Sequence, residues 1–303
     1  MSLRRDERGQ SAVIAVLFLT VLLGMTAMVV DVGFWFRAQR RAQSQADAAA
    51  LAGAQLLPAD PSKAAATAIS YASENGVTIT ANDVSFPDAE TIKVDVRSPQ
   101  PGFFSKVFGI DAVTVHAKAA ARAYRPYEAR FLAPIVVNQA HPKLSGPDCP
   151  CFGPDNETTI PLNRNGAPGA FDLLNLDASS GGAIGSSTIA TWIKHGFDDY
   201  LPLGGYYSDP GAKFNSHDVG DALDLKIGDV LLFPVYDTLV GTGSNAKYHI
   251  IGWVGFNLTA FDASGSSGSL TGYFTSTIWT GLDAVPGGTP GPDLGVRSVE
   301  LVQ

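Results

Sequence analysis

Charged residues are scarce in this chain of 303 residues: they make up 17% of it, and residues 10–30 contain none. Glycine and proline are frequent by comparison, with 32 and 19 copies. A sequence this rich in turn-forming residues is typical of a β-rich body rather than of a long helical bundle. The length is sufficient for one or two domains with a sizeable core.

Basic residues are outnumbered, with 21 Lys and Arg against 29 Asp and Glu, which gives a formal net charge of −8. Three arginines and three acidic residues cancel within the first 31 residues, so the rest of the chain carries the excess. A body this acidic repels phosphate backbones, and we therefore predict no nucleic-acid partner.

Residues 10–30 form a continuous uncharged, apolar run of 21 residues. As a helix it would span about 31 Å, which matches the hydrocarbon core of a bilayer. We predict a retained transmembrane anchor over residues 10–32. A cleaved secretory signal and a buried helix of a soluble protein are the alternatives. Phe34, Trp35 and Phe36, followed by arginines, favour the anchor because this order is typical of a membrane interface.

The orientation of the anchor does not follow from the arginines, because three precede the apolar run and three follow it. Residues 1–9 are too few to fold, whereas the body after the anchor is large and acidic. We therefore predict a single-pass protein of the cell membrane, with residues 1–9 as a cytoplasmic tail and the body outside the cytoplasm.

The anchor helix is expected to continue as a stalk to residue 57, because residues 37–57 are rich in Ala, Gln and Leu and contain no proline. Small side chains allow another element to approach closely. The predicted helix-packing face consists of Ala46, Ala49, Ala50 and Gly53. This face packs either on the protein's own domain or on a partner helix.

The predicted fold class is α+β. Residues 33–125 are expected to hold the stalk and a small helix-on-sheet module. Its elements are a helix over 61–75, strands over 91–97 and 113–121, and a short turn or helix over 103–109. Residues 124–130 are predicted to be a linker between this module and the rest of the chain.

Residues 130–285 are predicted to form a β-rich barrel or sandwich outside the cytoplasm, and residues 286–303 a C-terminal tail. The expected strands are 132–138, 158–162, 170–176, 229–236, 248–261 and 269–279, of which the last three form a meander. One helix is expected over residues 186–195, with serine caps and Gly196 as its stop.

The only two cysteines, Cys149 and Cys151, flank a proline. A disulfide between them would close a tight ring, and oxidation is the default outside the cytoplasm. Free thiols and a metal site are the alternatives, although a metal needs three or four ligands and only His141 is near in sequence. We predict no cofactor.

An enzyme is the third class considered, because His195, His217 and His249 lie among many serines and aspartates. No Gly-x-Ser-x-Gly nucleophile elbow lies between a strand and a helix, and no nucleophile–base pair stands out. The acidic pairs at residues 198–199 and at Asp221 and Asp224 are too sparse for a calcium loop and are expected in solvated turns. We predict that the protein is not an enzyme.

Three segments resemble the N-terminal region of TadG-like proteins of bacterial Tad, or Flp, pilus-assembly systems. They are RGQSAVI at residues 8–14, DVG at 31–33 and ADAAALAGA at 46–54. The stretch 228–274 is similar to the body of a subset of these proteins. The resemblance implies a non-enzymatic membrane component of pilus assembly or secretion, whose partners are the lipid bilayer and other proteins of that system.

One departure separates the chain from the pilins of these systems. The related TadE-like pseudopilins carry a glutamate five residues after the glycine at which they are processed, and counting from Gly9 that position is Ile14. The difference favours an unprocessed, TadG-like protein. A minor pilin or adhesin-like surface subunit is the alternative, and an anchored extracytoplasmic enzyme or ligand-binding module is a further one.

Overall fold

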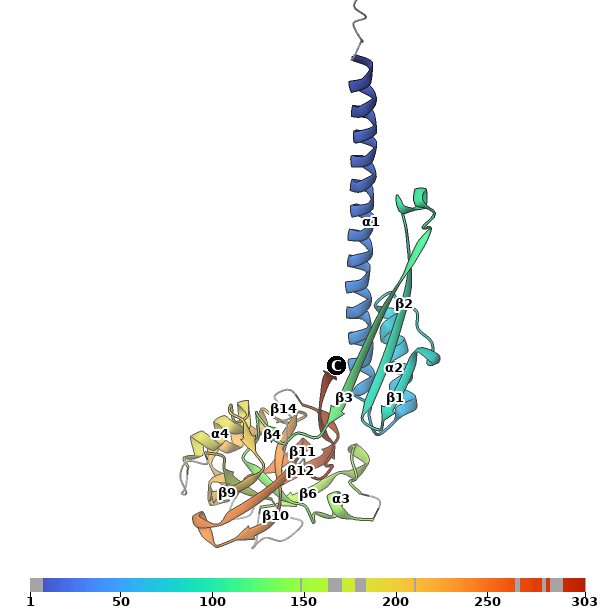
Figure 1. The fold of residues 1–303 in the computed structure, drawn as a ribbon. Helices are drawn as coiled ribbons and strands as arrows, with labels where there is room; N and C mark the ends of the chain where they lie inside the picture. Colours follow the sequence, from blue (N-terminus) through green and yellow to red (C-terminus); the bar gives the residue numbers. More distant parts are fainter. Residues whose placement is uncertain are drawn as a thin grey trace, which may run out of the picture. The chain divides into compact units, whose positions relative to one another are not determined.

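The computed structural model describes residues 8–147, 149–162, 171–177, 184–209, 211–264, 268–279, 282–283 and 291–302. The chain forms two compact units, Met1–Ala123 with Val299–Gln303, and Tyr124–Ser298 (Figure 1). Both units combine helices and strands, so the predicted α+β class is confirmed. Most of the predicted cytoplasmic tail, residue 170 of a predicted strand and residues 286–290 lie outside the described residues.

The first unit is built on one helix, α1 (Arg8–Ala54), which is 47 residues long. The predicted anchor and stalk are therefore a single helix, which ends three residues before the expected position. Its second half is rich in alanine, the residue with the highest helix propensity. Five alanines of that half lie on one face of the helix and are buried: Ala42, Ala46, Ala49, Ala50 and Ala54.

Helix α2 (Pro61–Glu74) packs on this face. Asp60 caps its start by accepting the Lys63 N–H at 2.8 Å, with Pro61 at the first helical position. The buried residues of α2 are Ala64, Ala68 and Ala72. Two facing rows of alanines therefore bring the two helices close together.

Both helices share their core with a sheet. The strand order in this sheet is β1 (Val84–Asp88), β2 (Thr91–Pro101), β3 (Ala112–Tyr124) and β15 (Val296–Val302). A 3₁₀ turn, η1 (Ala81–Asp83), precedes it. The side chains of β2 alternate between the core and solvent, as the predicted strand over 91–97 requires. The inward-facing Ile92, Val94 and Val96 of β2 join the alanine rows in one core.

The hairpin of β2 and β3 is long and antiparallel, pairing Thr91 with Arg122 at one end and Pro101 with Ala112 at the other. Its far turn holds the 3₁₀ helix η2 (Ser105–Phe108), where the sequence predicted a turn or short helix. In Figure 1 this hairpin runs alongside α1. Residues 296–302, placed in the C-terminal tail by the sequence analysis, form strand β15, and Val299 packs against the core of the first unit.

The second unit contains a seven-stranded sheet in the order β10-β5-β7-β9-β11-β12-β6. Strand β10 also pairs with β11, so β10, β5, β7, β9 and β11 close into a ring that is barrel-like. The bounds are β5 (Ile135–Asn138), β6 (Thr158–Pro161), β7 (Phe171–Asn175), β9 (Gly204–Asp209), β10 (Val230–Val240), β11 (Lys247–Asp262) and β12 (Ser269–Thr275). The predicted meander of the last three strands is confirmed.

Short elements surround this sheet. Strands β14 (Leu282–Asp283), β4 (Glu128–Ala129) and β8 (Leu201–Pro202) form a small sheet, and β13 (Thr277–Ile278) pairs with the start of β15. The helices are α3 (Pro142–Ser145), α4 (Ser186–His195) and α5 (His217–Asp224), with 3₁₀ turns η3 (Pro154–Asn156), η4 (Gly211–Asn215) and η5 (Gly243–Asn245). Helix α4 has the predicted bounds, but Gly185 caps it without a side-chain bond, so the predicted serine cap is wrong.

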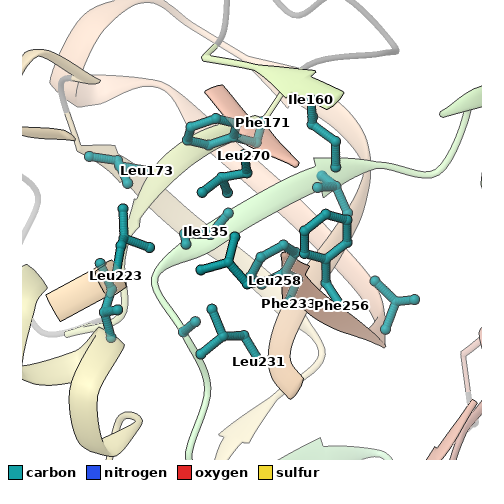
Figure 2. Close-up of a cluster of buried hydrophobic side chains, with 14 of the residues drawn as sticks. Ile135, Ile160, Phe171, Leu173, Leu223, Leu231, Phe233, Phe256, Leu258 and Leu270 are labelled. Atoms are coloured by element: carbon teal, nitrogen blue, oxygen red, sulfur yellow. The ribbon is translucent and has the colours of Figure 1, made fainter. Parts of the chain in front are cut away.

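The core of the second unit is packed from both strands and helices. Phe233 and Phe256, on the paired strands β10 and β11, stack with ring centroids 5.1 Å apart. Strands β5, β6, β7 and β12 and helix α5 contribute further buried aliphatic and aromatic side chains (Figure 2). A second cluster, which includes Tyr206, Tyr248 and Trp253, is also buried.

Candidate functional site: the membrane anchor

The first half of α1 shows its apolar side chains on every side. The large hydrophobic residues from Val13 to Val30 are between 44% and 71% exposed. Within the described part of the chain, α1 is the one helix long and apolar enough to cross a membrane. An apolar helix that no protein surface covers is stable in the lipid hydrocarbon, because its backbone polar groups bond within the helix and its side chains are removed from water. This arrangement fits a single-pass membrane anchor.

The apolar run ends at a buried carboxylate. Asp31 is 1% exposed, although it follows immediately after the exposed part of the helix. Its side chain accepts the backbone N–H groups of Phe103, Phe104 and Ser105 at 3.1, 2.9 and 2.6 Å. Three charge-assisted hydrogen bonds stabilise the carboxylate where water does not reach it. Asp31 therefore fastens the turn of the β2–β3 hairpin to the end of the apolar run.

Glutamine side chains attach the next part of α1 to strand β3. The Gln43 amide donates to the Lys118 carbonyl oxygen at 3.0 Å, and that of Gln39 donates to the His116 carbonyl oxygen. The stalk thus bonds to the backbone of β3 at two carbonyl groups that lie two residues apart.

The predicted helix-packing face lies inside the first unit. Ala46, Ala49 and Ala50 are fully buried, and a Cβ built on Gly53 would lie 2.6 Å from Cδ1 of Ile92. Helix α2 and strand β2 cover this face. Of the two possibilities left open by the sequence, the structure has the packing on the protein's own domain.

Cys149 and Cys151 are joined by a disulfide in the second unit. His141 is the nearest histidine in sequence, and its side chain has other partners. Its Nδ1 accepts the Lys143 N–H at 3.1 Å, and its ring packs edge-on against Phe274. Among the described residues, no group of three or more His, Cys, Asp or Glu is arranged to hold a metal ion.

Burial lowers the pKa of His141 to about 4, and the nearby positive charge of Lys143 adds to the effect. The folded protein therefore disfavours the protonated ring. As the pH falls below 6.5, the usual pKa of histidine, the unfolded chain takes up this proton first. The contribution of neutral His141 to stability is complete above pH 6.5 and is lost as the pH falls toward 4.

His141→Asn is expected to make stability less sensitive to acid, because asparagine can cap α3 but does not titrate. The titration of His141 should cost less than about 1.4 kcal/mol per pH unit. The measurement is urea unfolding of both proteins at pH 7 and pH 5. An equal loss of stability in the two proteins would show that His141 is not the group responsible.

The three histidines considered for a hydrolase lie in different surroundings. His249 is within 2.8 Å of Asp237, and exposed His217 lies 3.5 Å from Asp221 on the same helix. His195 lines a cavity of about 90 Å³ together with Trp192 and Trp279. Asp221 and Asp224 lie on α5, which corrects their prediction as turn residues. Among the described residues, none of these three histidines is paired with a nucleophilic side chain.

The sequence analysis missed the contact between Asp31 and the hairpin. Asp31 and Phe103 are 72 residues apart, so no local pattern links them. The only signal was the position of Asp31 directly after an uncharged run, because a carboxylate at that point needs donors from elsewhere in the fold.

Comparison with known families agrees with the resemblance stated for the N-terminal region. Residues 9–56 match the family model described as "Putative Flp pilus-assembly TadE/G-like". The match covers the anchor and stalk of α1 and all but the first residue of the three motifs. Residues 228–274, which were also expected to resemble this family, lie outside it. No curated protein and no solved structure matches the chain.

Proposed function

We propose that this protein, whose residues 9–56 match the TadE/G-like Flp pilus-assembly family, is a non-enzymatic, membrane-anchored component of a bacterial Flp/Tad-type pilus-assembly or secretion system. The observation that carries the proposal is that the matched segment coincides with the one described helix able to span a membrane. A family-specific sequence and an exposed apolar surface thus occupy the same residues.

The body lies outside the cytoplasm in this proposal. A folded body follows the anchor along the chain. The disulfide between Cys149 and Cys151 supports the same orientation, because disulfides persist in oxidising compartments and are rare in the cytosol. The N-terminus then lies in the cytoplasm.

The membrane half of α1 carries a continuous exposed apolar surface that is open to a partner. The small-residue face of the stalk is covered by α2 and β2, so a partner helix has no access to Ala49 or Gly53 in the folded unit. Side chains such as Phe18 and Val29 are 65% and 71% exposed. Lipid and the membrane helices of other assembly proteins therefore share this surface.

Photo-crosslinking from the anchor tests the proposal in cells. A benzophenone amino acid is placed in turn at residues 16, 17, 18 and 19, which together cover the helix circumference because successive residues are about 100° apart. We expect adducts with Flp/Tad-type assembly proteins from at least one position. The matched control is the same amino acid at Phe86, an exposed residue of β1.

The same cells report the orientation and the alternative. Val240→Cys is expected to react with a membrane-impermeant maleimide in spheroplasts, since Val240 is 71% exposed. Labelling only after lysis would place the body in the cytoplasm.

Adducts that contain no assembly protein would contradict the function. A mature N-terminus at Gln10 would instead identify a minor pilin.

A further inference from the structure

The turn between β2 and β3 exposes several apolar side chains. We define the hairpin tip as residues 103–110. Its exposed apolar residues are Phe103 (57%), Phe104 (48%), Val107 (84%), Phe108 (61%) and Ile110 (39%). Single exposed apolar residues are common, but a cluster of this size marks a surface that contacts something other than water.

The hairpin extends toward the membrane along α1. The Gln43 amide contacts the carbonyl of Lys118, and nearer the start of α1 the Trp35 indole N–H donates to the Pro101 carbonyl at 3.3 Å. Moving toward the anchor along α1 thus means moving toward the tip along the hairpin. The tip is therefore the part of the hairpin closest to the anchor (Figure 1).

Contacts with α1 hold the tip beside the end of the apolar run. The Asp31 carboxylate holds the three N–H groups described above. One turn further along α1, the ring of Phe34 packs edge-on against that of Phe103, with centroids 5.2 Å apart. Asp31 directly follows the uncharged residues 10–30, so the level it marks is the boundary between hydrocarbon and headgroups.

We propose that the hairpin tip inserts into the headgroup layer of the bilayer leaflet on the body side and forms a second, peripheral membrane contact beside the anchor. Aromatic and aliphatic side chains at this depth are removed from water. Exposed Lys106, within the tip, can pair with lipid phosphates. The tip and the helix then hold the first unit at two points. This inference rests on the proposed membrane anchoring.

Fluorescence quenching in the full-length protein tests the contact. An environment-sensitive fluorophore is attached to Val107→Cys in vesicles of phosphatidylcholine and phosphatidylglycerol, with or without lipids that carry a quencher. The native cysteines are joined to each other and do not react without a reductant. Matched labels at Leu19→Cys and Ala89→Cys report the anchor and the turn before β2. Ala89 is exposed and lies at the opposite end of the eleven-residue strand β2.

We expect lipid-borne quenchers to quench the labels at positions 107 and 19 severalfold more than the label at 89. Iodide in the buffer serves as a second quencher that reaches only labels in contact with water. Lipid quenching at position 19 alone, with iodide quenching at 107 equal to that at 89, would overturn the tip contact and leave the anchor standing. A label at 107 shielded from both quenchers would mean that protein covers the tip, which also overturns it. No quenching at 19 would remove the proposed anchoring as well.

A substitution of Asp31 tests whether this carboxylate holds the tip in the bilayer. Asp31→Leu removes the acceptor that holds the tip while retaining a helix-forming residue. We expect the lipid quenching at position 107 to fall toward that at 89, while the label at 19 is unchanged. A tip that remains quenched in this variant would show that Asp31 does not set its position.

Discussion

Gly53→Val is expected to lower the melting temperature of the first unit by about 5–20 °C. An added Cβ would lie 2.6 Å from Cδ1 of Ile92, 2.9 Å from the carbonyl oxygen of Ala64 and 3.2 Å from Cβ of Ala68. Ile92 can rotate, but the carbonyl oxygen belongs to the backbone of α2 and cannot. Valine therefore forces α1 and α2 apart, and overpacking of this kind costs about 1–3 kcal/mol.

Circular dichroism of the full-length protein in detergent measures this change, and hydrogen exchange locates it in α2. The matched control is Gly33→Val in the same helix, where an added Cβ meets nothing within 4 Å. The control should melt close to the wild type, because valine is no worse than glycine inside a helix. If both variants melt like the wild type, α1 and α2 do not approach as closely as described.

Phe256→Ala is expected to destabilise the second unit by about 3–5 kcal/mol. The side chain is fully buried, stacked on Phe233 and edge-on to Phe274 with centroids 5.2 Å apart. Removing the ring leaves a cavity between strands whose backbones are fixed by pairing on both sides of β11. Since domains are stable by only about 5–15 kcal/mol, the loss is a large share of the total.

Urea unfolding followed by tryptophan fluorescence measures the loss, because Trp192, Trp253 and Trp279 all lie in the second unit. Phe261→Ala is the matched control: the same substitution in the same strand, at a residue only partly buried. It should cost clearly less. Equal losses would mean that the full burial and ring packing of Phe256 add nothing to the stability that a partly buried phenylalanine provides.

Sequence patterns predicted the elements whose stability is local. The uncharged run and the alanine-rich segment after it predicted one helix, and each part favours a helix for its own reason. In lipid a helix satisfies all its backbone polar groups, and alanine has the highest helix propensity. Strands β2, β10 and β11 showed alternation or long apolar runs. The alanines of α1 were recognised as a packing surface, but only the fold shows that α2 covers them.

Other elements depend on distant partners. Strand β9 begins with two glycines and has little propensity of its own, yet it pairs with both β7 and β11. Helix α5 contains Gly220 and three aspartates, which read as a turn, but Val219, Ala222 and Leu223 bury one side of it. Strand β15 follows residues rich in proline and glycine and was placed in a tail. Tertiary packing decided each of these cases against local preference.

The candidate site divides in the same way. The anchor was predicted because its signal is continuous along the sequence. The carboxylate that ends it, and the apolar turn that this carboxylate holds, come together only through a hairpin about 70 residues further along the chain. No composition or spacing rule connects residues so far apart.

Strand β15 changes how the two units share one polypeptide. The chain leaves the first unit after Ala123 and returns to it at Val299. The second unit is thus a long excursion between two neighbouring strands of one sheet, secured at both ends. Deleting residues 299–302 would therefore remove part of β15 from the first unit and leave the residues of the second unit intact.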